Sequence, residues 1–223
     1  MRRVLLGTFL VLAGLVQACS APFLHPLATD RNTVYEASMI GTWKEVDPDD
    51  GAKENRYTVT RAESPGGGAD RYVVEVRYRP GDGRELATAR IDAAHVRLGP
   101  LEFLDFSLSE SEREKVGDVA RMFSLPVHYV MRLDRPNPED QDIIRLSELS
   151  GTWLDEQLRK DDGILRHEHL DQDKLLITAS TDEIEAFFRK YGATDEAYSE
   201  FLTLMRDNPN PPGRIVPTTP DRP

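Results

Sequence analysis

Apolar and polar side chains alternate along several stretches in the first two-thirds of the chain. The clearest stretch is 72–79, in which one face would carry Tyr72, Val74, Val76 and Tyr78. A period of two is typical of a β-strand with one buried face. The same reasoning predicts strands at 39–46, 56–60, 86–91, 94–98, 101–108, 127–133 and 142–149. Short turns rich in glycine and proline separate many of these runs, so successive strands should pair antiparallel.

Helical spacing interrupts this pattern and then dominates the last third of the chain. A capping box at 109–114 predicts an inserted helix over 110–123, which ends before Pro126. The last third predicts a helix at 151–161, a short strand at 174–179, a helix from Ser180 to Gly192, and another helix after Thr194 with Tyr198, Phe201, Leu202 and Met205 on its inner face. The fold class is therefore mainly β (α+β). We expect an antiparallel barrel or a strongly curved meander, with an inserted helix and C-terminal helices, since closure leaves no unpaired strand edge.

The N-terminus has the layout of a secretory signal peptide. Arg2 and Arg3 precede an almost wholly apolar stretch at 4–16, which is too short to span a membrane. It ends in Val16-Gln17-Ala18-Cys19, which resembles the lipobox of bacterial lipoproteins. That resemblance implies that residues 1–18 are removed and that Cys19 carries acyl chains such as palmitate. Ser20 follows the cysteine, and in this family that favours the outer membrane. An ordinary signal peptide with an incidental cysteine is the alternative.

The remaining chain divides by composition. Residues 19–37 contain the lipidated cysteine and a tether, 38–207 form a single β-rich domain, and 208–223 are a proline-rich flexible tail. We therefore expect the protein to be a cell-envelope protein that the lipid, and not a transmembrane helix, holds on the membrane.

Composition excludes several classes of function. Among 223 residues the net charge is −11, which argues against nucleic-acid binding, because phosphate neutralisation needs clustered Lys and Arg. The single cysteine excludes a disulfide framework and a cysteine-rich zinc module. Nucleophile elbows and phosphate-binding glycine loops do not occur in the sequence. We therefore expect no enzymatic activity and no cofactor.

Gly41-Thr42-Trp43 enters the first predicted strand and resembles the lipocalin signature. In that family the tryptophan closes the base of an eight-stranded barrel, and the glycine permits a close approach of the backbone. Trp43 as a core aromatic with no role beyond folding is the alternative. The blocks around 125–128 and 176–180 are also similar to uncharacterised bacterial envelope proteins.

The leading functional hypothesis is that the barrel binds a small apolar or amphipathic ligand. The inward faces of two strands would then supply the ligand-binding residues Tyr72, Tyr78, Tyr129 and Met131. A structural or interaction lipoprotein, with a filled barrel and another envelope protein as its partner, is the alternative. A metal-dependent hydrolase is the third hypothesis. It depends on His167 and His169, which share one side of an extended segment, with His95 or His128 as a further ligand. The alternative is that His167 and His169 are solvent-exposed loop residues that bind no metal.

Overall fold

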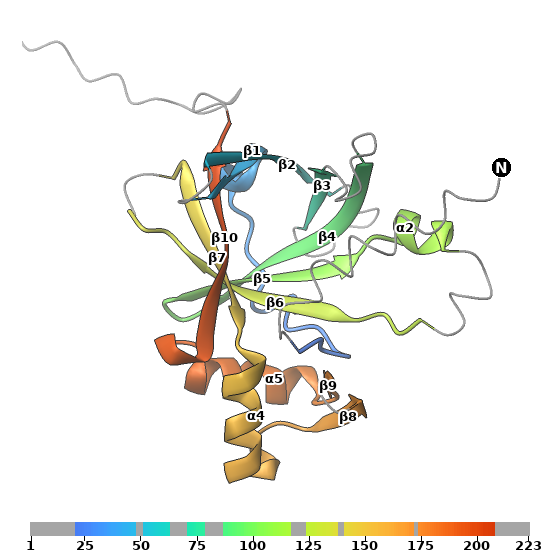
Figure 1. Ribbon diagram of the computed structural model, residues 1–223, viewed down its shortest axis with the longest axis vertical. Coiled ribbons are helices and arrows are strands. Elements are labelled where there is room, and N and C mark those ends of the chain that lie inside the picture. Colours follow the sequence, from blue (N-terminus) through green and yellow to red (C-terminus); the bar gives the residue numbers. More distant parts are fainter. Residues whose placement is uncertain are drawn as a thin grey trace, which may run out of the picture.

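The computed structural model describes residues 21–47, 51–62, 71–78, 87–116, 124–137, 141–171 and 174–207. Within them, eight antiparallel strands close into a barrel in the order β1-β10-β7-β6-β5-β4-β3-β2 (Figure 1). The strands are β1 (Gly41–Asp47), β2 (Gly51–Arg61), β3 (Tyr72–Tyr78), β4 (Ala87–Leu98), β5 (Leu101–Leu108), β6 (His128–Asp134), β7 (Ile143–Leu149) and β10 (Tyr198–Arg206). The predicted mainly β barrel is confirmed. The two runs predicted at 86–91 and 94–98 form one strand, β4.

Successive strands pair with one another except between β7 and β10, where the chain leaves the barrel. This insertion comprises α4 (Gly151–Lys160), η2 (Asp162–Ile164), the hairpin β8 (His167–Asp171) and β9 (Lys174–Ile177), α5 (Thr181–Tyr191) and η3 (Asp195–Ala197). It packs below the barrel in the view of Figure 1. The helices expected at 151–161 and from Ser180 to Gly192 form as α4 and α5. Ser180 N–H donates to Glu183 Oε2 at 2.7 Å, as a capping box requires. The inserted helix begins as expected with α2 (Glu110–Lys115), whereas 117–123 lie outside the described residues.

β10 corrects the prediction of a helix after Thr194. Its apolar residues fit helical spacing, but the backbone pairs with β7 on one side and with β1 on the other. A register shift between Glu200 and Leu202 changes the phase of the strand, so that Leu202, Leu204 and Arg206 then alternate as buried residues. Long-range pairing thus outweighs the local periodicity, and this strand closes the barrel.

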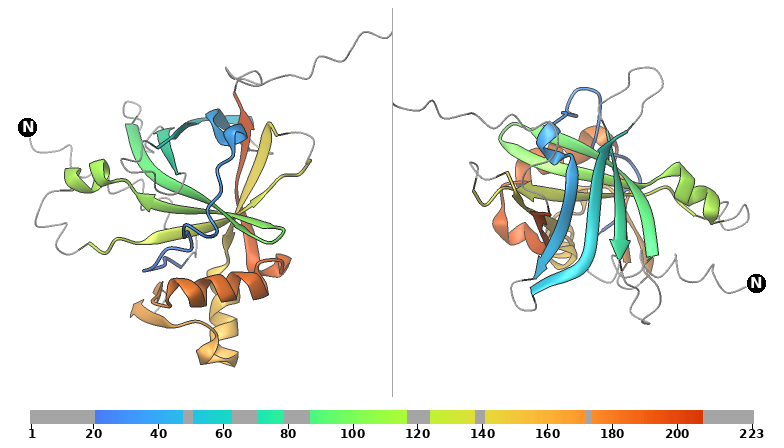
Figure 2. Two further views of the ribbon diagram at one scale, coloured as in Figure 1. Left: turned by 180° about the vertical axis from the view of Figure 1, so that it is seen from behind. Right: turned by 90° about the horizontal axis from the view of Figure 1, so that it is seen from above.

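The segment 21–40 differs from the tether expected up to residue 37, because it packs along the outer wall of the barrel. Phe23 and Leu27 are fully buried in the core between this wall and the insertion. The segment reaches η1 (Ala37–Met39) at the barrel end where β1 begins (Figure 2). No helix in the described part of the chain is long and apolar enough to cross a membrane.

The buried apolar residues form two clusters. One lies inside the barrel and includes Trp43, Tyr72 and Leu104. The other lies between the outer wall, the insertion and the N-terminal segment, and includes Phe103, Phe188 and Ile184. The insertion packs on outward-facing side chains of the barrel, so the inward-facing side chains form a separate cluster.

Candidate functional site

The two ends of the barrel differ, and we name each by a residue. The Trp43 end is where β1, β3, β5 and β7 begin, and the Tyr129 end is where β2, β4, β6 and β10 begin. Cross-strand register places the side chains of Tyr72, Val74, Val76 and Tyr78 on the inner face, together with alternate residues of β4, β5 and β6. The candidate ligand-binding residues Tyr72, Tyr78, Tyr129 and Met131 therefore all face the barrel interior.

Trp43 blocks the first of these ends. Its side chain is 1% exposed, and the indole Nε1–H donates to Met39 O at 3.0 Å. The Arg206 guanidinium lies 4.2 Å from the Trp43 ring centroid and donates to Asp142 Oδ1 at 2.8 Å. Gly41 has φ +136°, and a Cβ there would lie 2.6 Å from Arg206 Nη1. Glycine two residues before the tryptophan is thus required both by the backbone conformation and by the close approach of the arginine.

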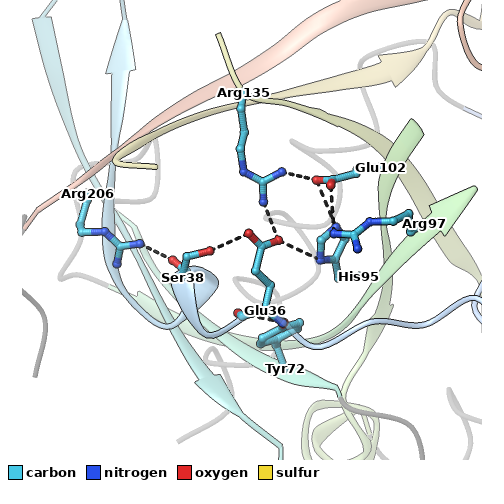
Figure 3. A network of polar contacts seen from close by, with 8 residues as sticks. All are labelled: Glu36, Ser38, Tyr72, His95, Arg97, Glu102, Arg135 and Arg206. Carbon is cyan, nitrogen blue, oxygen red and sulfur yellow. Dashed lines mark hydrogen bonds and ion pairs between the residues drawn. The ribbon is translucent and has the colours of Figure 1, made fainter. Parts of the chain in front are cut away.

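A buried polar network lies beside this plug (Figure 3). His95 on β4 is 0% exposed, with Nδ1 at 3.6 Å from Glu36 Oε2 and Nε2 at 3.4 Å from Glu102 Oε2. Arg135, which follows β6, donates to Glu36 Oε2 at 2.7 Å and also to Glu102. Glu36 N–H in turn donates to the Tyr72 hydroxyl at 2.7 Å. The N-terminal segment, β3, the β4–β5 hairpin and the residues after β6 therefore meet in one polar network.

The geometry of this network suits paired ions better than a metal ion. Ligand atoms of Glu36, His95 and Glu102 lie within 4.8 Å of one another. Each carboxylate, however, faces a different nitrogen of the His95 ring, and a single metal ion binds only one of them. The Arg135 guanidinium already occupies the cationic position between the carboxylates. Contacts with His95, and then with Arg135, lower the pKa of Glu102 to about 2, although burial alone would raise it.

Along β5 and β6, inward-facing side chains become more exposed toward the other end of the barrel, whereas Tyr78 at that end of β3 is buried. On β5, Leu104 is buried, whereas Phe106 and Leu108 are half-buried. On β6, Leu133 is buried, whereas Met131 and Tyr129 are half-buried. The interior is therefore sealed at the Trp43 end, and at the Tyr129 end it is partly exposed on the side formed by β5 and β6.

Small side chains line one wall of the interior. The inner face of β4 carries Ala87, Ala89 and Ala93, with Ile91 as the one larger residue among them. The facing residues on β3 include Tyr78 and Val76, which pair with Ala87 and Ala89. Three alanines on one strand leave more interior volume than larger aliphatic residues would.

Tyrosine hydroxyls lie among the polar groups near the Tyr129 end, together with the buried carboxylate of Glu148, which pairs with Met131 across β6 and β7. Burial, and after it the Glu112 carboxylate, raises the pKa of Tyr78, and burial alone raises the pKa of Tyr129. Tyr57 was not among the sequence candidates, although burial and the nearby Glu45 raise its pKa as well. In the sequence, only the weak alternation of apolar and polar residues at 56–60 indicated that Tyr57 could face the barrel interior. Tyr72, in contrast, is bound to Glu36 at the sealed end.

His167 and His169 lie side by side, but neither His95 nor His128 joins them. His167 and His169 lie on β8 with ring centroids 5.2 Å apart, and His167 Nδ1 is 3.0 Å from Leu165 O. His128 Nδ1 instead lies 2.8 Å from Asp105 Oδ1, and His95 belongs to the network at the Trp43 end. In the described ranges, no third histidine, cysteine or carboxylate completes a ligand group with His167 and His169. Cys19 lies outside the described residues.

A cleft of about 540 Å³ lies outside the barrel, between the N-terminal segment, β4 and α5. Its lining is charged and internally paired. Arg31 contacts Asp182 at 3.2 Å, and Arg189 contacts Glu185 at 2.7 Å. This cleft therefore does not provide the apolar surface that an apolar ligand needs.

Comparison with family models, with curated proteins and with solved structures finds no match to this chain.

Proposed function

We propose that this protein is a lipid-anchored cell-envelope protein, placed at the outer membrane, which binds a small apolar or amphipathic ligand through the Tyr129 end of its barrel. The observation that carries the binding proposal is the difference between the ends. A mostly apolar interior, which also contains the buried Glu148, is closed by Trp43 and Arg206 at one end, and its inward-facing Phe106, Tyr129 and Met131 are half-buried at the other. An interior of this kind favours ligands with an apolar body.

The tyrosines suit a ligand that also has a polar group. Burial raises the pKa of Tyr78 and of Tyr129, and the protonated phenol of each can donate a hydrogen bond. Phe106 and Met131 supply apolar area near them. The expected ligand therefore has an acyl or other apolar chain with a polar head.

The anchor rests on Val16 to Cys19, and metabolic labelling tests it. Cells supplied with labelled palmitate should label the protein, and Cys19→Ser should abolish the label. Label that persists in the Cys19→Ser protein would rule out lipidation at this position.

A bulky substitution on the alanine wall tests the binding site. We expect the mature chain with Cys19→Ser to bind a fluorescent fatty acid saturably, and Ala89→Trp to abolish binding because the indole occupies the interior. Thr88→Trp is the matched control, since Thr88 is exposed on the outer face of the same strand. The same affinity for Ala89→Trp and Thr88→Trp would exclude the barrel interior as the binding site.

The second candidate function is an interaction lipoprotein with a filled barrel. The observation that favours it is the continuous buried cluster that runs from Trp43 and Tyr72 to Tyr78. The stability of Ala89→Trp distinguishes the two candidate functions. Overpacking a filled core lowers the free energy of unfolding by about 1–3 kcal/mol, whereas a tryptophan that enters free volume lowers it less. Saturable binding by the parent chain together with a stable Ala89→Trp protein would favour the ligand site. No saturable binding together with strong destabilisation would favour the filled barrel.

A further inference from the structure

The first described residues of the chain are fixed at the Tyr129 end of the barrel. Phe23 N–H donates to His128 O at 2.9 Å, and His128 N–H donates to Phe23 O at 2.8 Å. Ile177 N–H donates to Pro22 O at 2.9 Å. Residues 22 and 23 are therefore held between the first residue of β6 and the last residue of β9.

Because residues 22 and 23 are held in place, a lipid attached to Cys19 must start close to this end of the barrel. Consecutive Cα atoms are about 3.8 Å apart, so the Cα of Cys19 lies within about 8 Å of the Cα of Ala21. Ala21 is itself buried, two residues before the paired Phe23. An acylated Cys19 would thus bring the membrane surface close to the Tyr129 end, whereas the Trp43 end lies at the far end of the strands.

Two exposed leucines lie at the same end. Among the described residues, the exposed large apolar side chains are Leu170 at 59%, Leu125 at 57% and Tyr35 at 38%. Leu170 is next to the turn of the β8–β9 hairpin, and Leu125 lies three residues before β6. Figure 1 and the left view of Figure 2 place the hairpin, the start of β6 and the start of the described chain on one side. Tyr35 differs, because its ring stacks on Tyr72 at 5.8 Å near the other end.

We propose that the Tyr129 end of the barrel faces the membrane, with Leu125 and Leu170 inserted into the lipid surface, so that the ligand enters the barrel from the bilayer. This inference rests on the proposed lipid anchor. A net charge of −11 gives anionic lipids no general attraction for the protein, so the contact must come from the acyl chains and from apolar side chains. Each leucine that enters the lipid surface removes apolar area from water.

In this orientation, the difference between the sealed Trp43 end and the partly exposed Tyr129 end has a function. The end sealed by Trp43, Arg206 and the network around His95 points to the aqueous side. The end with half-buried Phe106 and Tyr129 points to the lipid. A ligand with an acyl chain would then pass between bilayer and barrel without crossing water.

Fluorophores at single cysteines test this orientation in the lipidated protein. Lipidation consumes the thiol of the sole native cysteine, Cys19, so Leu125→Cys and Leu170→Cys each provide one labelling site. Pro100→Cys is the control, because Pro100 is exposed in the β4–β5 turn at the Trp43 end. The labelled proteins are reconstituted into vesicles of phosphatidylethanolamine and phosphatidylglycerol that contain a spin-labelled phospholipid as a quencher.

We expect quenching of the labels at Leu125 and Leu170 to be several-fold stronger than quenching at Pro100, with a shift of their emission to shorter wavelength. Vesicle-bound protein in which all three labels respond alike would refute the membrane-facing orientation and leave the anchor intact. Protein that does not bind vesicles at all would refute the anchor and, with it, this inference. The fatty-acid titration of the Cys19→Ser chain separately decides whether the barrel binds a ligand.

Discussion

Asp105 joins the N-terminal segment to the outer wall of the barrel, and its removal is the sharpest test of that packing. Its carboxylate is 2% exposed, and Oδ2 accepts the backbone N–H groups of Leu27 at 2.8 Å and Ala28 at 2.9 Å. Oδ1 lies 2.8 Å from His128 Nδ1. Asp105→Ala would leave two buried N–H groups without their acceptor and would remove the partner of His128. We expect the free energy of unfolding to fall by about 3–5 kcal/mol, because each buried donor left unpaired costs about 1–3 kcal/mol.

Asp105→Asn is the matched control. Its amide oxygen can accept both N–H groups in place of Oδ2, and its NH₂ can donate to the Nδ1 of a suitable tautomer of His128. We therefore expect Asp105→Asn to lose less than half as much stability as Asp105→Ala in urea unfolding. Proteolysis within residues 21–34 of folded Asp105→Ala should also be faster. An Asp105→Ala protein that loses less than about 1 kcal/mol would show that these hydrogen bonds do not fix the segment.

Three further predictions concern the barrel and the tail. Trp43→Ala should lower the unfolding free energy by about 3–5 kcal/mol in urea titration, because it empties the Trp43 end, and a smaller loss than about 1 kcal/mol would contradict its role as a plug. The pKa of Glu102 falls from 4.5 to about 2 in the folded protein, so its carboxylate stabilises the fold fully above pH 4.5 and loses that effect as the pH falls toward 2. The stability advantage of the parent over Glu102→Gln, measured by chemical unfolding across this range, should therefore shrink, and a constant difference would refute the assignment. Deletion of 209–223, which hold six of the 15 prolines, should leave the unfolding midpoint unchanged, and a loss above about 1 kcal/mol would mean that the tail packs on the domain.

Alternation along the chain was sufficient to predict most of the barrel. Each of these strands has one face in the interior, and a buried face requires apolar residues at every second position. β10 was missed because its bulge disturbs the alternation and brings Phe201, Leu202 and Met205 into helical spacing. The information that makes this segment a strand lies in the free edges of β1 and β7, which the segment itself does not contain.

The polar network could not be predicted from the sequence. Glu36, His95, Glu102 and Arg135 come from four segments, and each is an ordinary polar residue among its own neighbours. His95 was considered only as a further metal ligand for the histidines of β8. Its actual partners follow from the register of β4 with β5 and from the path of the N-terminal segment, and both are tertiary features.

The N-terminal segment connects the polar network at the Trp43 end of the barrel with the contacts of Phe23 at the Tyr129 end. A flexible tether would let the barrel turn freely above a lipid anchor, and neither end would then be held near the membrane. Residues 21–40 instead pair with β6 and β9 near Phe23, bind Asp105 through Leu27 and Ala28, and end in the ion pairs of Glu36. Buried ion pairs contribute little net stability, but they fix one arrangement of the groups they join. Contacts along its whole length hold this segment in one place on the barrel, so the position of an acylated Cys19 would determine which end of the barrel meets the bilayer.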